Sequence, residues 1–190
     1  MLIPVLGVLV VLLAGFALAV SRRPAAYRVE RVIDITAPSG PVFAELNDLD
    51  RLSGCLVLFG QPLHEFDPQL QKSLSGPPSG PGQTLRWSGN FSAGRCTLTL
   101  VESTPDRGVG ITMAFEKPMV SKVACTLALA EAPGGTRVAW SMAGRHNILG
   151  KAMGLFMDMD MDKSLGADIE AGLGRLKRAV EEDGGAARPL

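Results

Sequence analysis

The residues that could carry chemistry centre on one aspartate in the C-terminal part of the chain. Apolar residues from Ile148 to Val180 recur with the 3.6-residue period of a helix, and Asp162 falls on this apolar stripe between Met159 and Gly166. A carboxylate on a buried helix face is costly unless it is paired or hydrogen-bonded. Asp162 is therefore a candidate polar anchor for a ligand, or a general base with a raised pKa. The alternative is that the helix bends near a glycine, so that Asp162 is hydrated or pairs with a basic side chain.

The other reactive residue types form no recognisable catalytic or metal-binding pattern. The three cysteines, Cys55, Cys96 and Cys125, are widely spaced, and three thiols cannot all pair with one another. Cys96 and Cys125 fall on the apolar faces of predicted strands, where cysteine acts as a small buried hydrophobe. His64 and His146 stand alone in predicted loops. We therefore expect no metal site and no cofactor, and no Ser/His/Asp or Cys/His arrangement can be assembled.

The charge balance argues against a nucleic-acid-binding protein. Nineteen basic residues face nineteen acidic residues, so no basic surface for phosphates is predicted. The hydrophobic fraction of 46% is high, and much of the excess lies in the first twenty residues. The rest of the chain still has enough apolar residues to bury a core.

An uncharged apolar run occupies residues 2–20 and is followed by Arg22 and Arg23. At helical rise it spans about 28 Å, which is close to the hydrocarbon thickness of a bilayer. We expect a single-pass membrane anchor over residues 1–21 and a linker over residues 22–26. The two arginines weakly favour a cytoplasmic domain, but the side of the membrane stays open. A signal peptide with a cleavage site at Ala17-Leu18-Ala19 is the alternative; the lack of Lys or Arg before the run argues against it.

The middle of the chain has the period-two pattern of half-buried strands, which indicates a sheet with one buried and one wet face. Seven segments show it: residues 27–36, 71–74, 84–88, 95–101, 109–115, 123–129 and 137–142. A short helix is predicted after Ala37-Pro38, and another short helix with a loop between residues 49 and 68. A long helix is predicted from about residue 147 to 182, with several glycines that favour a bend, and a disordered tail over residues 183–190.

These elements predict an α+β domain over residues 27–182, with a curved antiparallel sheet of six or seven strands wrapped around the C-terminal helix. A ligand would sit where the two apolar faces meet imperfectly. Trp87 and Trp140, on inward faces of different strands, could form a wall for such a ligand or could be ordinary core. The expected ligand-binding residues, on the inward strand faces and the helix stripe, are Leu85, Trp87, Leu98, Met113, Phe115, Leu127, Trp140, Met142, Leu155, Met159 and Asp162.

A series of local motifs in a fixed order adds to this interpretation. They are Ala37-Pro38 before Val42-Phe43, Ser75-Gly76-Pro77, Trp87-Ser88-Gly89-Asn90, Gly94-Arg95, Gly135-Thr136-Arg137-Val138 with Trp140 and Met142, and Gly150-Lys151. Over residues 25–180 this pattern resembles the START-like superfamily with its helix-grip fold, and more narrowly the polyketide cyclase-like SRPBCC proteins that carry an N-terminal membrane helix. Such relatives usually have a Trp-rich stretch after the first helix, whereas residues 52–60 here contain no Trp.

The resemblance implies a protein that holds a hydrophobic small molecule, but the fold alone does not choose among its functions. Our main hypothesis is a membrane-tethered binder or carrier of an apolar small molecule or lipid. The alternatives are a polyketide cyclase-, hydratase- or hydrolase-like enzyme acting on a hydrophobic substrate in the same cavity, and an interaction module with a filled core. The oligomeric state is not predicted by the sequence.

Overall fold

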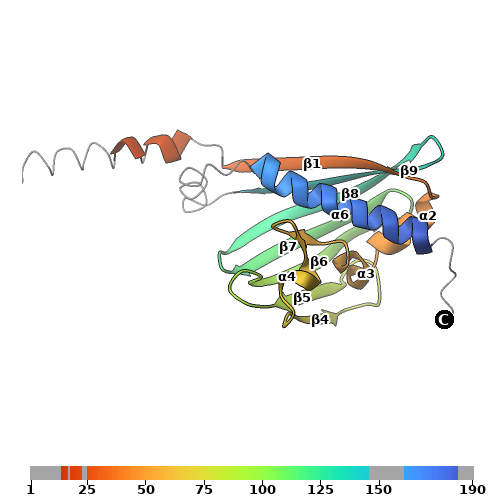
Figure 1. Ribbon diagram of the computed structural model, residues 1–190, viewed down its shortest axis with the longest axis horizontal. Helices are drawn as coiled ribbons and strands as arrows, with labels where there is room; N and C mark the ends of the chain where they lie inside the picture. Colours follow the sequence, from red (N-terminus) through yellow and green to blue (C-terminus); the bar gives the residue numbers. More distant parts are fainter. Residues whose placement is uncertain (1–13, 17, 23–24, 146–160, 184–190) are drawn as a thin grey trace, which may run out of the picture.

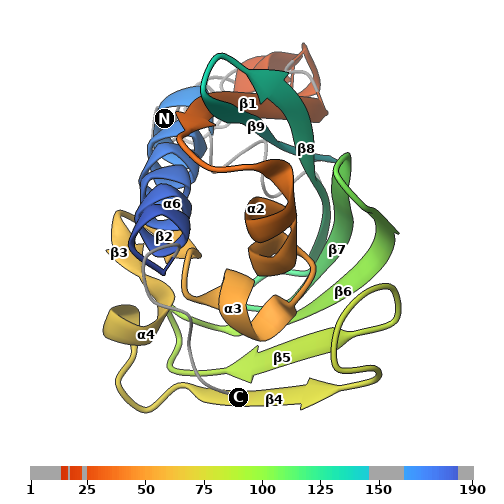
Figure 2. The ribbon, with the colours of Figure 1, turned by 90° about the vertical axis from the view of Figure 1, so that its right-hand side faces the viewer.

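The computed structural model describes residues 14–16, 18–22, 25–145 and 161–183. Its main element is a seven-stranded antiparallel sheet with the strand order β1-β9-β8-β7-β6-β5-β4. The strands are β1 (Ala26–Ile35), β4 (Gln71–Ser75), β5 (Thr84–Ser88), β6 (Arg95–Thr104), β7 (Gly108–Lys117), β8 (Ser121–Ala132) and β9 (Gly135–Arg145). Figure 2 shows the sheet as an arc that runs from β1 to β4, with α6 (Met161–Asp183) on its concave side.

The helices cover the concave face of the sheet. Helix α6 crosses this face and packs chiefly against the edge strand β1 (Figure 1). The short helices α2 (Ser39–Leu46) and α3 (Leu49–Ser53) lie inside the arc, and α4 (Leu63–Phe66) follows a small hairpin of β2 (Val57–Leu58) and β3 (Gln61–Pro62). The sheet therefore supplies one wall of the interior, and α6, α2 and α3 supply the other.

The residue alternation explains how the sheet buries one face. In β8, Val123, Cys125, Leu127 and Leu129 are buried while their neighbours are exposed. On α6 the buried side chains Ile169, Leu173, Leu176 and Val180 recur at helical spacing and meet this face. The edge strand β4 differs, because all five of its residues are exposed.

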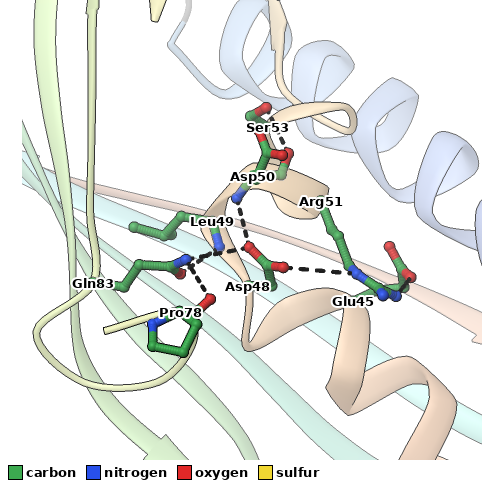
Figure 3. A network of polar contacts seen from close by, with 8 residues as sticks. All are labelled: Glu45, Asp48, Leu49, Asp50, Arg51, Ser53, Pro78 and Gln83. Carbon is green, nitrogen blue, oxygen red and sulfur yellow. Dashed lines mark hydrogen bonds and ion pairs between the residues drawn. The ribbon is translucent and has the colours of Figure 1, made fainter. Parts of the chain in front are cut away.

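One buried glutamine joins the short helices to the sheet. Gln83 is only 3% exposed, and its side-chain Oε1 accepts a hydrogen bond from the Leu49 backbone N–H at 2.7 Å (Figure 3). Its Nε2 donates to the Pro78 carbonyl oxygen at 2.8 Å and to Asp48 Oδ1 at 3.3 Å. A buried amide is tolerated when its donors and acceptors are satisfied, and these bonds fix the start of α3 against β5.

The predicted α+β architecture is confirmed, including the seven strands of the antiparallel sheet and the C-terminal helix. The small β2–β3 hairpin was not predicted, because its two-residue strands are too short to show a period. The predicted beginning of the C-terminal helix, residues 147–160, lies outside the described residues.

The structure does not support the predicted transmembrane anchor, and it contradicts the predicted single-pass membrane localisation. Residues 14–16 and 18–22 are helical, but in the described part of the chain no helix is both long and apolar enough to cross a bilayer. The apolar run of residues 2–20 was the basis of that prediction, and residues 2–13 and 17 lie outside the described residues.

Candidate functional site

A cavity of about 320 Å³ lies between the concave face of the sheet and the first half of α6. Most of its lining is apolar and comes from five strands of the sheet, from α6, from residues 56–59 and from loop residues 92–93 and 118–119. The sheet residues of the lining include Trp87, Met113, Phe115, Trp140 and Met142. The rings of Trp87 and Phe115 meet edge to face with centroids 6.2 Å apart, a favourable packing for aromatic side chains.

The ten apolar residues among the predicted ligand-binding residues divide into three groups. Five of them, Trp87, Met113, Phe115, Trp140 and Met142, line the cavity. Three others, Leu85, Leu98 and Leu127, are fully buried core residues outside the lining, although they share the same inward alternation. The last two apolar candidates, Leu155 and Met159, lie outside the described residues. That the first five contact a ligand stays a prediction.

Asp162 is not part of the cavity lining. Its side chain is 63% exposed, and its carboxylate accepts hydrogen bonds from the Arg31 guanidinium at 3.0 and 3.1 Å. Arg31 also bonds to Glu170 at 2.6 Å, and its guanidinium lies against Gly166, where an added Cβ would overlap it. This side of α6 therefore faces the edge strand β1, and Asp162 does not point into the interior.

The predicted general base with a raised pKa is consequently wrong for Asp162. The Arg31 hydrogen bonds hold the pKa of Asp162 below its ordinary value, because they favour the charged carboxylate. The alternative in which Asp162 pairs with a basic side chain is the one that the structure shows. Arg31 was missed as that partner because it interrupts the polar–apolar pattern of β1, where it occupies an inward-facing position.

A second carboxylate, Asp168, lies in the cavity lining and was missed by the sequence. Its Oδ1 accepts a hydrogen bond from the Gly60 N–H at 2.7 Å and its Oδ2 one from the Phe59 N–H at 3.0 Å. Both residues have positive φ angles, 52° for Phe59 and 80° for Gly60, so this turn has an uncommon backbone conformation. Asp168 thus ties the turn between β2 and β3 to α6.

Tyr27 from β1 brings a phenol to the cavity lining. The ring lies across Gly144, its partner on β9, where an added Cβ would stand 2.5 Å from the Tyr27 hydroxyl oxygen. Partial burial raises the pKa of Tyr27 above its usual range, because desolvation disfavours the phenolate. Tyr27 is therefore a neutral phenol near pH 7.

The three cysteines are buried free thiols. Burial raises the pKa of Cys55 to about 11 and those of Cys96 and Cys125 to about 12. Trp140 Nε1 donates a hydrogen bond to Cys125 Sγ at 3.0 Å, which fixes this indole against β8. Within the described residues, no cluster of three or more His, Cys, Asp or Glu side chains could hold a metal ion.

The comparison with protein families decides which family this arrangement belongs to. Residues 26–181 match the model described as "Polyketide cyclase / dehydrase and lipid transport". The chain belongs to this family. The resemblance to polyketide cyclase-like proteins is thereby confirmed, whereas the N-terminal membrane helix is not supported. A search of curated proteins finds no match.

Solved structures of similar fold have very different sequences. A norcoclaurine synthase point mutant from Thalictrum, solved with a transition-state analogue, has a TM-score of 0.60 at 7% identity over 85% of this chain and 98% of that chain. The di-domain protein StfQ from steffimycin biosynthesis has a TM-score of 0.59 at 11% identity over 87% of this chain and 54% of that chain. A protein from Chromobacterium violaceum has a TM-score of 0.54 at 15% identity over 84% of this chain and 99% of that chain. These likenesses show a shared helix-grip-like fold.

Proposed function

We propose that this protein binds an apolar small molecule or lipid in the cavity between the sheet and α6, and carries it chemically unchanged. The observation that supports this best is the cavity of about 320 Å³ with its predominantly apolar lining. Cavities of this kind bind ligands by removing apolar surface from water, with a few polar groups that set orientation.

An enzyme acting on a hydrophobic substrate in the same cavity is the second candidate. It is favoured by the family description, which names a cyclase and a dehydrase, and by the similar fold of a norcoclaurine synthase. Acid–base catalysis needs a group directed at the reacting atoms. The carboxylate that the described lining contains, that of Asp168, has both oxygens engaged by backbone N–H groups. A carrier is therefore the better-supported function.

The position of the tryptophans allows a direct test with the full chain. Trp87 and Trp140 are the only tryptophans in the sequence, and both line the cavity. A neutral apolar probe with a heavy atom at its tail, ω-bromoundecanol, should quench their fluorescence saturably because the bromine atom enters the cavity. Undecanol without bromine should displace the probe and restore the fluorescence.

A matched pair of variants on α6 locates the bound probe. Ser164 lines the cavity, whereas Ala167 is exposed on the same helix and is not part of the lining. Ser164→Phe places a ring in the cavity, so the probe can bury less of its apolar surface there. Probe binding should weaken at least about tenfold, which corresponds to the loss of about two buried methylene groups. Ala167→Phe should leave binding unchanged. Absence of saturable quenching in the wild-type protein, or equal binding by both variants, would contradict the proposal.

Native mass spectrometry followed by organic extraction separates the carrier from the enzyme. A carrier purified as the full chain should retain a stoichiometric apolar adduct that organic extraction removes. The extracted compound should keep its mass when it is incubated with fresh protein. Conversion of the extracted compound into a new product by fresh protein would instead support the enzyme.

A further inference from the structure

A lysine stands at the end of the cavity where β7 ends. Met113, Phe115 and Lys117 occupy alternate positions of β7, and all three contribute to the cavity lining. Side chains at alternate positions of a strand point to the same face of the sheet. The pairing of β6 with β7 has a register shift between Arg95 and Cys96, next to Lys117, yet Lys117 still borders the cavity as an exposed residue at the end of β7.

Lys117 also borders a second hollow, which we call the outer groove and which is lined by residues 88–91, 94–95 and 117–118. The cavity and the outer groove share Lys117 and Pro118. Phe91, which is 85% exposed, forms part of the outer groove. An elongated molecule whose apolar body fills the cavity would thus place its other end beside the Lys117 ammonium group.

The charged neighbours leave this ammonium group available. Arg95, the cross-strand partner of Lys117, forms an ion pair with Glu116 at 3.7 Å. Glu116 also pairs with Arg86 at 3.9 Å, so this carboxylate lies between two arginines, of which Arg95 also lines the outer groove. Asp168, across the cavity on α6, directs both carboxylate oxygens to backbone N–H groups. Lys117 has no ion pair and no side-chain hydrogen bond to any residue that the structure describes.

From this placement we infer that the ligand is an anionic amphiphile, with an apolar body in the cavity and a carboxylate held by Lys117 at its mouth. This inference rests on the proposed function and gives it a ligand class. A lysine on a flexible stem can follow the head group while its methylene groups cover the apolar body. An exposed ion pair adds only modestly to affinity, so Lys117 selects among ligands and the cavity supplies most of the binding.

Two probes that differ only in the head group test this ligand class. The wild-type protein should bind ω-bromoundecanoate about threefold to fivefold more tightly than ω-bromoundecanol, the range expected for a partly exposed ion pair. The preference should shrink at high ionic strength because salt screens the pair. Quenching of Trp87 and Trp140 reports the bound tail in both cases.

Variants of Lys117 assign the preference to one side chain. Lys117→Gln should abolish the preference, so that the bromo acid and the bromo alcohol bind with equal affinity, whereas Lys117→Arg should keep the preference. The matched control is Lys122→Gln, because Lys122 is exposed on β8 between the inward-facing Ser121 and Val123 and is absent from both hollows.

Equal affinities of the wild-type protein for acid and alcohol would overturn the inference and leave the proposed function standing. A preference that survives Lys117→Gln, or one that Lys122→Gln removes equally, would also overturn it. If neither probe binds the wild-type protein, the proposed function fails and this inference fails with it.

Discussion

Two glycines on α6 should respond in opposite directions to the same substitution. At Gly172 an added Cβ would lie 2.8 Å from the Cys55 carbonyl oxygen and 2.9 Å from Cζ3 of Trp140, whereas at Gly174 nothing lies within 4 Å. Both residues are inside α6, where replacing glycine by alanine gains about 1 kcal/mol of helix propensity. Gly174→Ala should therefore stabilise the protein by about 0.5–1 kcal/mol.

At Gly172 the close contacts of an added Cβ oppose the gain in helix propensity. One of its neighbours is backbone and the other is a buried ring, so neither can move away freely, and overpacking a core costs about 1–3 kcal/mol. After the gain in propensity, Gly172→Ala should destabilise the protein by about 1 kcal/mol, which puts the two variants about 2 kcal/mol apart. With a slope of about 2 kcal/mol per molar urea, their unfolding midpoints should differ by about 1 M.

Urea unfolding of the full chain, followed by tryptophan fluorescence, measures this difference. Gly172→Ala should also weaken binding of ω-bromoundecanol, because Trp140 forms part of the cavity wall. If both variants shift the midpoint upward by the same amount, the close approach of α6 to Trp140 and to the Cys55 carbonyl is wrong.

Two further predictions concern the carboxylates of α6. Asp168→Ala removes the acceptor for the Phe59 and Gly60 N–H groups and should release the turn between β2 and β3. The dissociation rate of ω-bromoundecanol, measured by stopped-flow fluorescence, should then rise about threefold to tenfold, as expected for the loss of about 1 kcal/mol. An unchanged rate would show that this turn does not control release. Arg31 lowers the pKa of Asp162, so this pair stabilises the folded state above the ordinary aspartate value of 3.8 and loses its effect as the pH falls through the lower folded-state pKa. The difference in thermal midpoint between the wild type and Arg31→Gln should therefore shrink between about pH 6 and about pH 3, and a difference that grows on acidification would contradict this assignment.

The sheet could be predicted because the alternation of apolar and polar residues in each strand follows directly from burying one face of the sheet. In β8 the apolar residues at every second position, Val123, Cys125, Leu127 and Leu129, face the core, and this pattern is visible in the sequence. The cavity could be predicted only in part. Leu98 and Met113 face each other across β6 and β7 on the same inward face, yet only Met113 reaches the cavity. Alternation predicts which side chains face inward. It does not predict which of these side chains are covered by packing and which are left to line the cavity.

The polar contacts of α6 depend on residues that are distant in sequence. Arg31 is 131 residues from Asp162, and Gly60 is 108 residues from Asp168, so a helical wheel cannot show which strand or turn lies beside each carboxylate. The glycines of the helix predicted a bend from their propensity alone. In the structure Gly166 and Gly172 are points of close approach, to the Arg31 guanidinium and to Trp140.

The open sheet has a consequence for how the protein behaves in a crowded solution. The sheet is an open arc with β1 and β4 at its two edges, so these strands keep backbone groups without a neighbouring strand. Such edges can recruit strands from other molecules and seed aggregates. Helix α6 packs along β1, while β4 is only five residues long, fully exposed and charged at Lys72. Short, charged edge strands resist the addition of a foreign strand, so the chain can keep a ligand-sized opening without becoming a template for aggregation.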